Sequence, residues 1–429
     1  MTPRLSRGLR VGAACLIAAA WQLGAYPAAW AQQPPPPAGP APAPAAEAAA
    51  PAPTGMSTPT MTAPLVANPN PMKFDGGPFS TIYLTGAVSG LGMFQTAPLL
   101  GDHGSNVDLS NGTFALQNTE GLIQFFVMAG GYSFPTLGAP YFHVDKTMGD
   151  TFGPVPEGYL KIAPNDAFSV QAGKLPTLIG AEQAFTYQNM NIERGLLWAQ
   201  EPIVSRGVQA NYTMGPLAFN VSLNDGFYSD SYNWVTGAAT WTIDKENTLE
   251  LVGGGNFDHT DKNVFSCVLA GCPVASAVLT KTPFFPNNGS IFNVIYTYNA
   301  APVTITPYFQ YTNVPGTAKF PLGPTAGAST YGAALLANFA YNDNINLAAR
   351  WELIASTGSV GKGSANLLYG PGSDAASFTF TPTYTLGIGF LRADASVVTT
   401  ASTTPGFVFG HAGNRQTQGR FVVEAGVVF

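Results

Sequence analysis

The feature that most constrains this chain is a two-residue alternation of apolar and polar side chains, which runs from about Phe79 to the C-terminus. Successive side chains of a strand point to opposite faces, so this period predicts strands with one apolar and one polar face. Many segments reach the roughly 9–11 residues that a tilted strand needs to cross a bilayer. The strands of a soluble sandwich are usually only about 5–6 residues long. The clearest examples here are Val303–Thr312, Asn344–Ser356, Phe378–Leu386 and Leu217–Asn224.

Composition separates a membrane barrel from the other classes. Charged residues make up 10% of the chain, against roughly 25% in soluble domains. The mean hydropathy is only +0.12, and no span of about 20 apolar residues, as a membrane helix requires, follows the N-terminal region. The net charge of −6 argues against nucleic acid as a partner. Because lipid cannot satisfy an open sheet edge, the sequence predicts an all-β fold, a transmembrane antiparallel up-and-down β-barrel.

The connections between strands give a strand number. Short turns are expected near Asn118-Thr119, Pro164-Asn165-Asp166, Met214-Gly215, Asp244-Lys245-Glu246, Ala300-Ala301, Asn342-Asp343 and Gly387. Long loops are expected near 92–110, 132–154, 176–202, 225–231, 258–288, 313–329, 357–375 and 399–417. Seven turns and eight loops join about 16 strands, within a range of 14 to 18, if 111–117 is a short strand. Short periplasmic turns and long extracellular loops are typical of outer-membrane barrels.

The C-terminus carries a further signal of that class. Phe421, Val423, Ala425 and Val427 alternate with their neighbours, and the chain stops at Phe429. A terminal aromatic residue on an amphipathic strand is similar to the membrane-insertion signal that the barrel-insertion machinery reads. The alternative is an ordinary terminal strand that ends in Phe.

The N-terminal region is predicted to contain a secretion signal, followed by a linker that leads to the barrel. Residues 1–31 combine early arginines, an apolar run and Ala29-Trp30-Ala31, the pattern of a cleaved signal peptide; an uncleaved anchor is the alternative. Residues 32–72 are rich in Pro and Ala and predict a disordered periplasmic linker, either a tether towards the cell wall or a flexible lead-in. The barrel is then expected over residues 73–429.

The polar faces of the predicted strands should line a water-filled lumen, because barrels of 16–18 strands are wide enough to hold one. A charge that faces lipid at mid-depth costs roughly 2–4 kcal/mol for Arg or Lys, so ionisable residues are expected to face inward. These inward ionisable residues either determine which ions the channel prefers or are solvated groups that have no effect on ion preference. The predicted pore-lining residues are Glu157, Lys161, Arg350, Glu352, Arg392, Asp394 and Glu424.

The loop at 176–202 is unusually rich in charged and aromatic residues. Its candidate residues for a constriction of the lumen are Glu182, Glu193, Arg194 and Glu201, and Ile192–Ala199 suggests a short helical turn. We expect this loop to fold into the lumen and narrow it. The alternative is an ordinary surface loop.

The stretch Leu178–Tyr212 resembles the OmpL-like family of β-barrel porins. The resemblance rests on Gly180 with Glu182, on Asn191 with Arg194, and on Pro202 followed by Gly207-Val208. The Ser205-Arg206 pair departs from the pattern of that family. The resemblance implies an outer-membrane pore and assigns no binding residues.

Few residue patterns in this sequence indicate a catalytic site or a metal site. Cys267 and Cys272 are expected to form a local disulfide in an oxidising compartment. The catalytic alternative would use His143 with Asp145, or Asp258 with His259, and far more often such pairs are chance loop residues. Asp102, Asp108 and Asp150 match no calcium-loop spacing. We therefore expect no enzyme, no cofactor and no metal.

These observations predict a porin of a Gram-negative outer membrane, a channel for passive diffusion of ions and small hydrophilic solutes. The alternative is a non-conducting anchor or surface-binding barrel that acts through its extracellular loops. The expected partners are outer-membrane lipid, the insertion machinery and the solutes, with a homotrimer left open.

Overall fold

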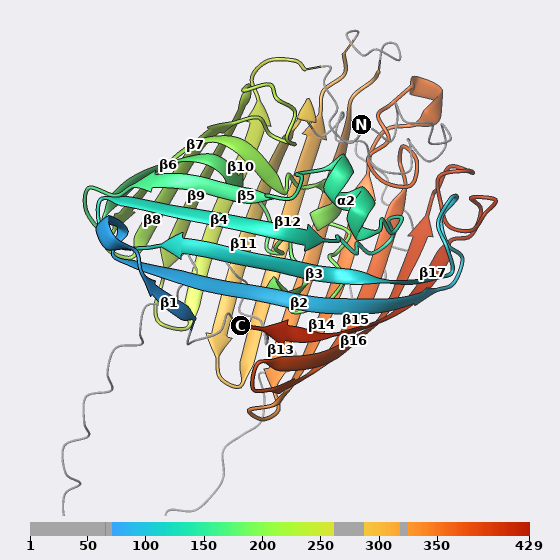
Figure 1. Ribbon diagram of the computed structural model, residues 1–429. Helices are drawn as coiled ribbons and strands as arrows, with labels where there is room; N and C mark the ends of the chain where they lie inside the picture. Colours follow the sequence, from blue (N-terminus) through green and yellow to red (C-terminus); the bar gives the residue numbers. More distant parts are fainter. Residues whose placement is uncertain (1–64, 66–70, 261–286, 318–324) are drawn as a thin grey trace, which may run out of the picture. The chain divides into compact units, whose positions relative to one another are not determined.

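The structure is a computed structural model that describes Leu65 and residues 71–260, 287–317 and 325–429. The predicted signal peptide, most of the linker, Cys267 and Cys272 lie outside the described residues. Within them, sixteen long strands follow one another along the chain (Figure 1). They are β2 Thr81–Gln95, β3 Ser105–Asn118, β4 Ile123–Tyr132, β5 Glu157–Ile162, β6 Phe168–Pro176, β7 Val204–Met214, β8 Leu217–Asn224, β9 Trp234–Thr242, β10 Asn247–Asn256, β11 Ser290–Ala300, β12 Val303–Val314, β13 Ala328–Ala340, β14 Ile345–Ser356, β15 Asp374–Leu386, β16 Gly389–Ala401 and β17 Thr417–Val428.

The strands close into a barrel. Each strand pairs antiparallel with the next one in sequence, and β17 pairs with β2 from Val428↔Ala87 to Arg420↔Gln95. Closure leaves no long sheet edge with unpaired backbone groups, which is what a lipid environment requires. The prediction of an antiparallel barrel of about 16 strands is confirmed.

All seven predicted turns join consecutive strands at one end of the barrel, the turn end, and the long connections lie at the other, the loop end. The predicted loop at 92–110 is wrong in extent, because β2 continues to Gln95 and β3 begins at Ser105. The β2–β3 register shifts between Ser89↔Asn111 and Gly90↔Leu109, so Ser110 is the extra residue of a β-bulge, and it interrupts the alternation within β3. The segment 111–117 therefore belongs to a strand of 14 residues.

A short strand was not predicted. It is β1, Met72–Asp75, and it pairs with Thr81–Leu84 at the start of β2. The 3₁₀ turn η1, Gly77–Phe79, connects β1 to β2.

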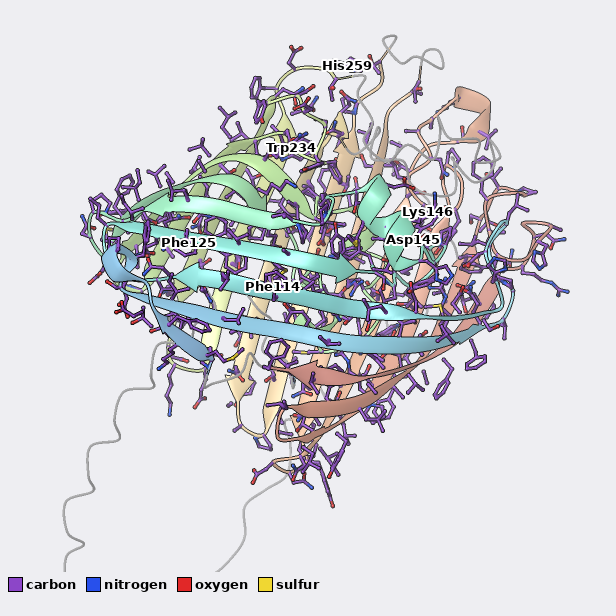
Figure 2. The ribbon with its side chains drawn as sticks, viewed as in Figure 1. Phe114, Phe125, Asp145, Lys146, Trp234 and His259 are labelled. Carbon is purple, nitrogen blue, oxygen red and sulfur yellow. The ribbon has the colours of Figure 1, made fainter. Side chains whose placement is uncertain are left out.

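The two faces of the wall differ as predicted. On β12 the outward Ile305 and Phe309 are exposed, whereas Thr304, Thr306 and Gln310 are buried inside. Phe114 on β3 is also exposed, and Trp234 at the start of β9 is buried (Figure 2). An apolar exterior around a polar interior suits a barrel in lipid. No helix among the described residues is long and apolar enough to span a membrane.

Connections at the loop end contain the remaining helical turns. Among the described residues, the longest is α2, Val144–Asp150, between β4 and β5; η5, Val360–Lys362, follows β14. The turns η2, Thr186–Gln188, and η3, Trp198–Gln200, lie in the connection 177–203 between β6 and β7. The helical turn predicted for Ile192–Ala199 is thus wrong, because only its last two residues belong to a 3₁₀ turn.

Candidate functional site

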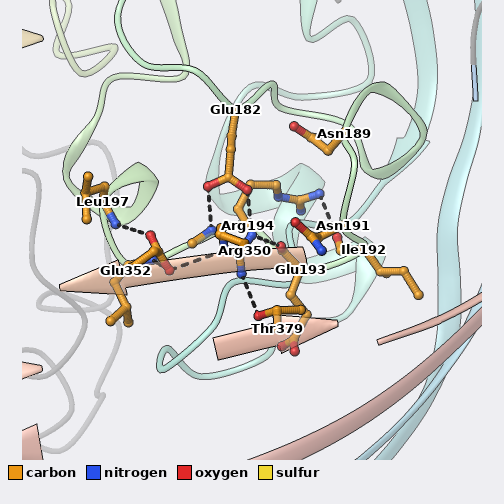
Figure 3. Close-up of polar contacts among 12 residues, drawn as sticks. Glu182, Asn189, Asn191, Ile192, Glu193, Arg194, Leu197, Arg350, Glu352 and Thr379 are labelled. Carbon is orange, nitrogen blue, oxygen red and sulfur yellow. Dashed lines mark hydrogen bonds and ion pairs between the residues drawn. The ribbon is translucent and has the colours of Figure 1, made fainter. Parts of the chain in front are cut away.

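The connection 177–203, called loop 177–203 below, contacts the inner face of the barrel on many strands. It follows β6 and returns to β7, so both of its ends are fixed by the wall. Phe185 and Tyr187 pack with the buried side chains of β4 and β5 on one side, including Phe126 and Tyr159. Polar side chains of the loop meet Arg350 of β14 on the other side (Figure 3). They also meet side chains of β16 and β17. The loop therefore lies inside the barrel and not over its outer surface.

Arg350 on β14 is the centre of the polar contacts, and its side chain is fully buried. Its guanidinium donates to the Glu182 carboxylate at 2.6 Å and to the Glu193 carbonyl at 2.6 Å, both in the loop. It also donates to the Thr379 hydroxyl on β15 at 3.2 Å. The Glu352 carboxylate lies 3.3 Å from the guanidinium. A buried guanidinium of this kind is stabilised because its charge is paired with two carboxylates and both of its terminal nitrogens donate hydrogen bonds.

Two carboxylates bind three consecutive backbone amides of the loop. Glu182 accepts from the N–H of Gly195 at 2.8 Å, and Glu352 accepts from Leu196 at 3.0 Å and Leu197 at 3.1 Å. These amides are consequently unable to donate to carbonyls four residues earlier, so the segment does not form the predicted helix. A Cβ on Gly195 would lie 2.2 Å from the Glu352 carboxylate, so this close approach requires glycine.

Glu193 joins the loop to β16 and β17. Its backbone N–H donates to Asp394 at 2.8 Å, and its carboxylate lies 2.9 Å from the guanidinium of Arg420. The Ser396 hydroxyl donates to the same carboxylate at 2.9 Å. Both partners of the Glu193–Arg420 ion pair are fully buried.

A second ion pair lies between β16 and β17. Arg392 is 2.7 Å from Glu424, and both side chains are fully buried. The loop contacts both partners, because Arg392 donates to the Asn189 carbonyl at 3.1 Å and Thr186 donates to Glu424 at 2.6 Å. Wall charges and loop backbone thus form one hydrogen-bonded network.

The other end of the loop is fixed to β12. Tyr308 donates to the buried Glu201 carboxyl, and Gln310 donates to the Leu197 carbonyl at 3.0 Å. Burial is the main cause that raises the pKa of Glu201 well above its ordinary value. Gly180, with φ of +92°, packs against Glu201; a Cβ there would lie 1.8 Å from a carboxyl oxygen. The two ends of the loop therefore meet at this contact.

Arg194 sits within the loop, with its side chain fully buried. Its guanidinium lies 5.3 Å from the ring centre of Trp198 and 5.8 Å from that of Phe134, distances at which cation–π attraction is significant. Burial lowers its pKa.

The structure thus brings together five of the seven residues predicted on inner faces, namely Arg350, Glu352, Arg392, Asp394 and Glu424, with all four predicted loop residues. Glu157 on β5 is buried away from this network, near Tyr187. Lys161 lines a cavity of about 710 Å³ at the turn end, with Gln124, Tyr159 and Ser169. Whether these residues line a conducting pore stays a prediction.

Sequence reasoning missed Arg420, although it alternates in step with Glu424 and was open to the same argument. It also missed Tyr308 and Thr379, which are uncharged and gave no signal beyond their polar face.

The other chemical candidates have structural contacts. His143 lies 3.3 Å from Asp108, and Asp145 is in the first turn of α2. Asp258 accepts from the backbone N–H of His259. Asp102 binds Gln95 and the N–H of Tyr141, and Asp150 pairs with Lys146. Among the described residues, no group of three or more His, Cys, Asp or Glu is placed to hold a metal ion.

The closed ring, its apolar exterior and its inward-folded loop define a channel-type β-barrel of the bacterial outer membrane. The sequence profile of the family described as "Putative beta-barrel porin-2, OmpL-like" matches residues 81–429, and the chain belongs to this family. The family and the fold point to a channel rather than an enzyme. A comparison with curated proteins gives no match.

Solved structures share the fold at low sequence identity. The outer membrane channel DcaP of Acinetobacter baumannii is 12% identical, with a TM-score of 0.54, over 83% of this chain and 99% of that one. The in-vitro folded OmpT, an outer membrane protein of Vibrio cholerae, is 12% identical, with a TM-score of 0.52, over 81% and 97%. OmpF of Salmonella typhi, solved with daunomycin, is 12% identical, with a TM-score of 0.51, over 83% and 100%.

Proposed function

We propose that this protein is a porin through which ions and small hydrophilic solutes diffuse passively across the outer membrane. The observation that carries this proposal is the contact of loop 177–203 with the inner wall of a 16-stranded barrel. Barrels of 16–18 strands have room for an aqueous channel. A loop held inside such a barrel narrows the passage, so it restricts solutes by size without closing the barrel to water.

The proposed constriction has charges of both signs. The wall supplies Arg350, Arg392 and Arg420, and the loop supplies Glu182 and Glu193. Because these side chains are buried and paired, we propose that they act on passing ions through their electrostatic field and not by direct contact. We propose that Glu352, Asp394 and Glu424 hold the arginines and the loop in place, and that Lys161 lines the wider region near the turn end.

The test is the single-channel conductance of refolded protein in a planar lipid bilayer, with a salt gradient to measure ion preference. We expect stable, ohmic steps, and the reversal potential reports the sign of the preference. A matched preparation of heat-unfolded protein must give no steps. Absence of conductance from a barrel shown to be folded would contradict the proposal and favour the non-conducting anchor that acts through its extracellular loops.

We further propose a homotrimer. Its support is that OmpT of Vibrio cholerae, which shares the fold at a TM-score of 0.52 and 10% identity, has been solved in a trimer form. Light scattering of the detergent-solubilised protein measures the mass of the assembly. A mass of one chain under conditions that preserve the folded barrel would contradict the trimer.

A further inference from the structure

The outer face of the barrel has a hollow of about 800 Å³ over β4–β8. It lies where Val127, Gly158, Lys174 and Arg206 stand side by side in register on four neighbouring strands. The apolar lining residues Val127, Val155, Val208, Leu223 and Tyr232 are all exposed. Because Gly158 has no side chain, the surface is low between taller neighbours. The shape and lining suit an acyl chain.

Lys174 gives this apolar surface a positive charge. It alternates with the inward Leu175 and lies two residues before the loop end of β6. Its ammonium group donates to the carbonyls of Phe152 at 2.9 Å and Val155 at 2.8 Å. An ammonium group has three N–H donors, so these bonds leave one. No carboxylate among the described residues lies within ion-pair distance of it.

Arg206 differs from Lys174 in this respect. Its guanidinium lies 2.8 Å from the buried Asp225 and 3.5 Å from the exposed Asp230, so it is already paired with two carboxylates. Tyr228 lies beside both cations, with its ring centre 4.1 Å from the Arg206 guanidinium and 5.6 Å from the Lys174 ammonium. Lys174 is therefore the cation of the hollow that has no carboxylate within ion-pair distance among the described residues.

We propose that this hollow binds an anionic lipid of the outer leaflet, with its phosphate group at Lys174 and an acyl chain over Gly158. A lysine that faces lipid is unfavourable unless an anion or water reaches it. The loop end corresponds to the extracellular side in barrels of this class, so the phosphate meets Lys174 close to the headgroup level. The site lies on the outer wall and does not depend on whether the barrel conducts.

The test is native mass spectrometry of the folded protein with equal amounts of dimyristoyl phosphatidic acid and dimyristoyl phosphatidylcholine, which have identical acyl chains. Wild-type protein should retain the phosphatidic acid preferentially. Lys174→Met should lower that preference about tenfold, the factor for one charge-assisted hydrogen bond. Lys146→Met is the matched control, because Lys146 lies on α2 and pairs with Asp150; it should retain the wild-type preference.

Gly158→Val tests the hollow independently of charge. A Cβ at Gly158 meets no atom closer than 3.7 Å, so the barrel accommodates it while the side chain fills the hollow. It should reduce retention of both lipids. Equal retention of the two lipids by wild type, or an unchanged preference in Lys174→Met, would overturn the proposal. An altered oligomer mass in Lys174→Met with no change in lipid preference would overturn it too, and would assign the hollow to a second copy of the chain.

Discussion

Replacing Arg350 by methionine should release loop 177–203 from the wall. The change removes a fully buried guanidinium that contacts Glu182, the Glu193 carbonyl and Glu352. Removing one partner of a buried pair costs about 3–5 kcal/mol, because the remaining carboxylate stays buried without its counter-charge. Glu352 keeps its bonds to Leu196 and Leu197, so we take the lower value. At about 1.4 kcal/mol per tenfold, the undocked population should rise about 100-fold.

Trypsin measures this population directly, since Arg194 in the loop is a cleavage site that is fully buried in the docked state. When opening and closing are faster than cleavage, the cleavage rate follows the open population. We expect cleavage after Arg194 to accelerate about 100-fold in Arg350→Met, together with a larger single-channel conductance. The matched control is Arg415→Met, because Arg415 is exposed in the connection between β16 and β17. A folded Arg350→Met barrel that is cut at the wild-type rate would refute this reasoning and show that apolar contacts alone hold the loop.

Three further predictions concern the ends of the loop and of the barrel. Because burial raises the pKa of Glu201, its neutral form stabilises the docked loop at low pH, and this contribution is lost as pH rises through the raised pKa. A loop that leaves the wall should widen the passage, so the conductance of wild type should increase as pH rises through that pKa and stay constant in Glu201→Gln; a decrease in wild type would contradict the assignment. Gly180→Ala forces a Cβ towards that carboxyl at positive φ and should lower the free energy of unfolding by about 1–3 kcal/mol, measured by denaturant titration against Gly92→Ala, where a Cβ meets nothing within 4 Å. Deletion of Phe429 removes two backbone hydrogen bonds to Gly86 and should reduce the folded fraction in membranes, as read from heat-dependent mobility on gels; an unchanged fraction would exclude a role in assembly.

The fold was largely predictable because a strand with one face towards lipid and one towards the polar interior alternates apolar and polar residues with a period of two. Val303–Thr312 shows this: its outward and inward faces in β12 are the two faces of the sequence pattern. Short turns such as Met214-Gly215 were also predicted correctly from the sequence. The β-bulge at Ser110 was not predictable, because one extra residue reverses the alternation between the two parts of β3. The part of the strand from Ser105 to Ser110 was therefore assigned to a loop.

The site was predictable only in part, since parity gives the face of a residue and not its partner. Arg350 and Glu352 were placed inward by parity, but their contacts with Glu182 and Leu197 join segments more than 150 residues apart in sequence. Loop 177–203 has no alternation of apolar and polar residues that would indicate its structure. Its backbone conformation depends on hydrogen bonds to side chains of the wall such as Glu352, and local sequence preference does not contain this information.

The seam between β17 and β2 determines how this chain can assemble. Ser89 and Glu424, whose side chains are hydrogen-bonded across it, are 335 residues apart in sequence. Bringing together two strands so far apart in sequence carries a large loop-closure entropy, and this slows the closing step. Until the seam forms, both edge strands carry backbone groups that lipid cannot satisfy. Assembly is therefore complete only when β17 pairs with β2. A chain that lacks β17 is expected to form no stable barrel in lipid, because its sheet edges stay unpaired.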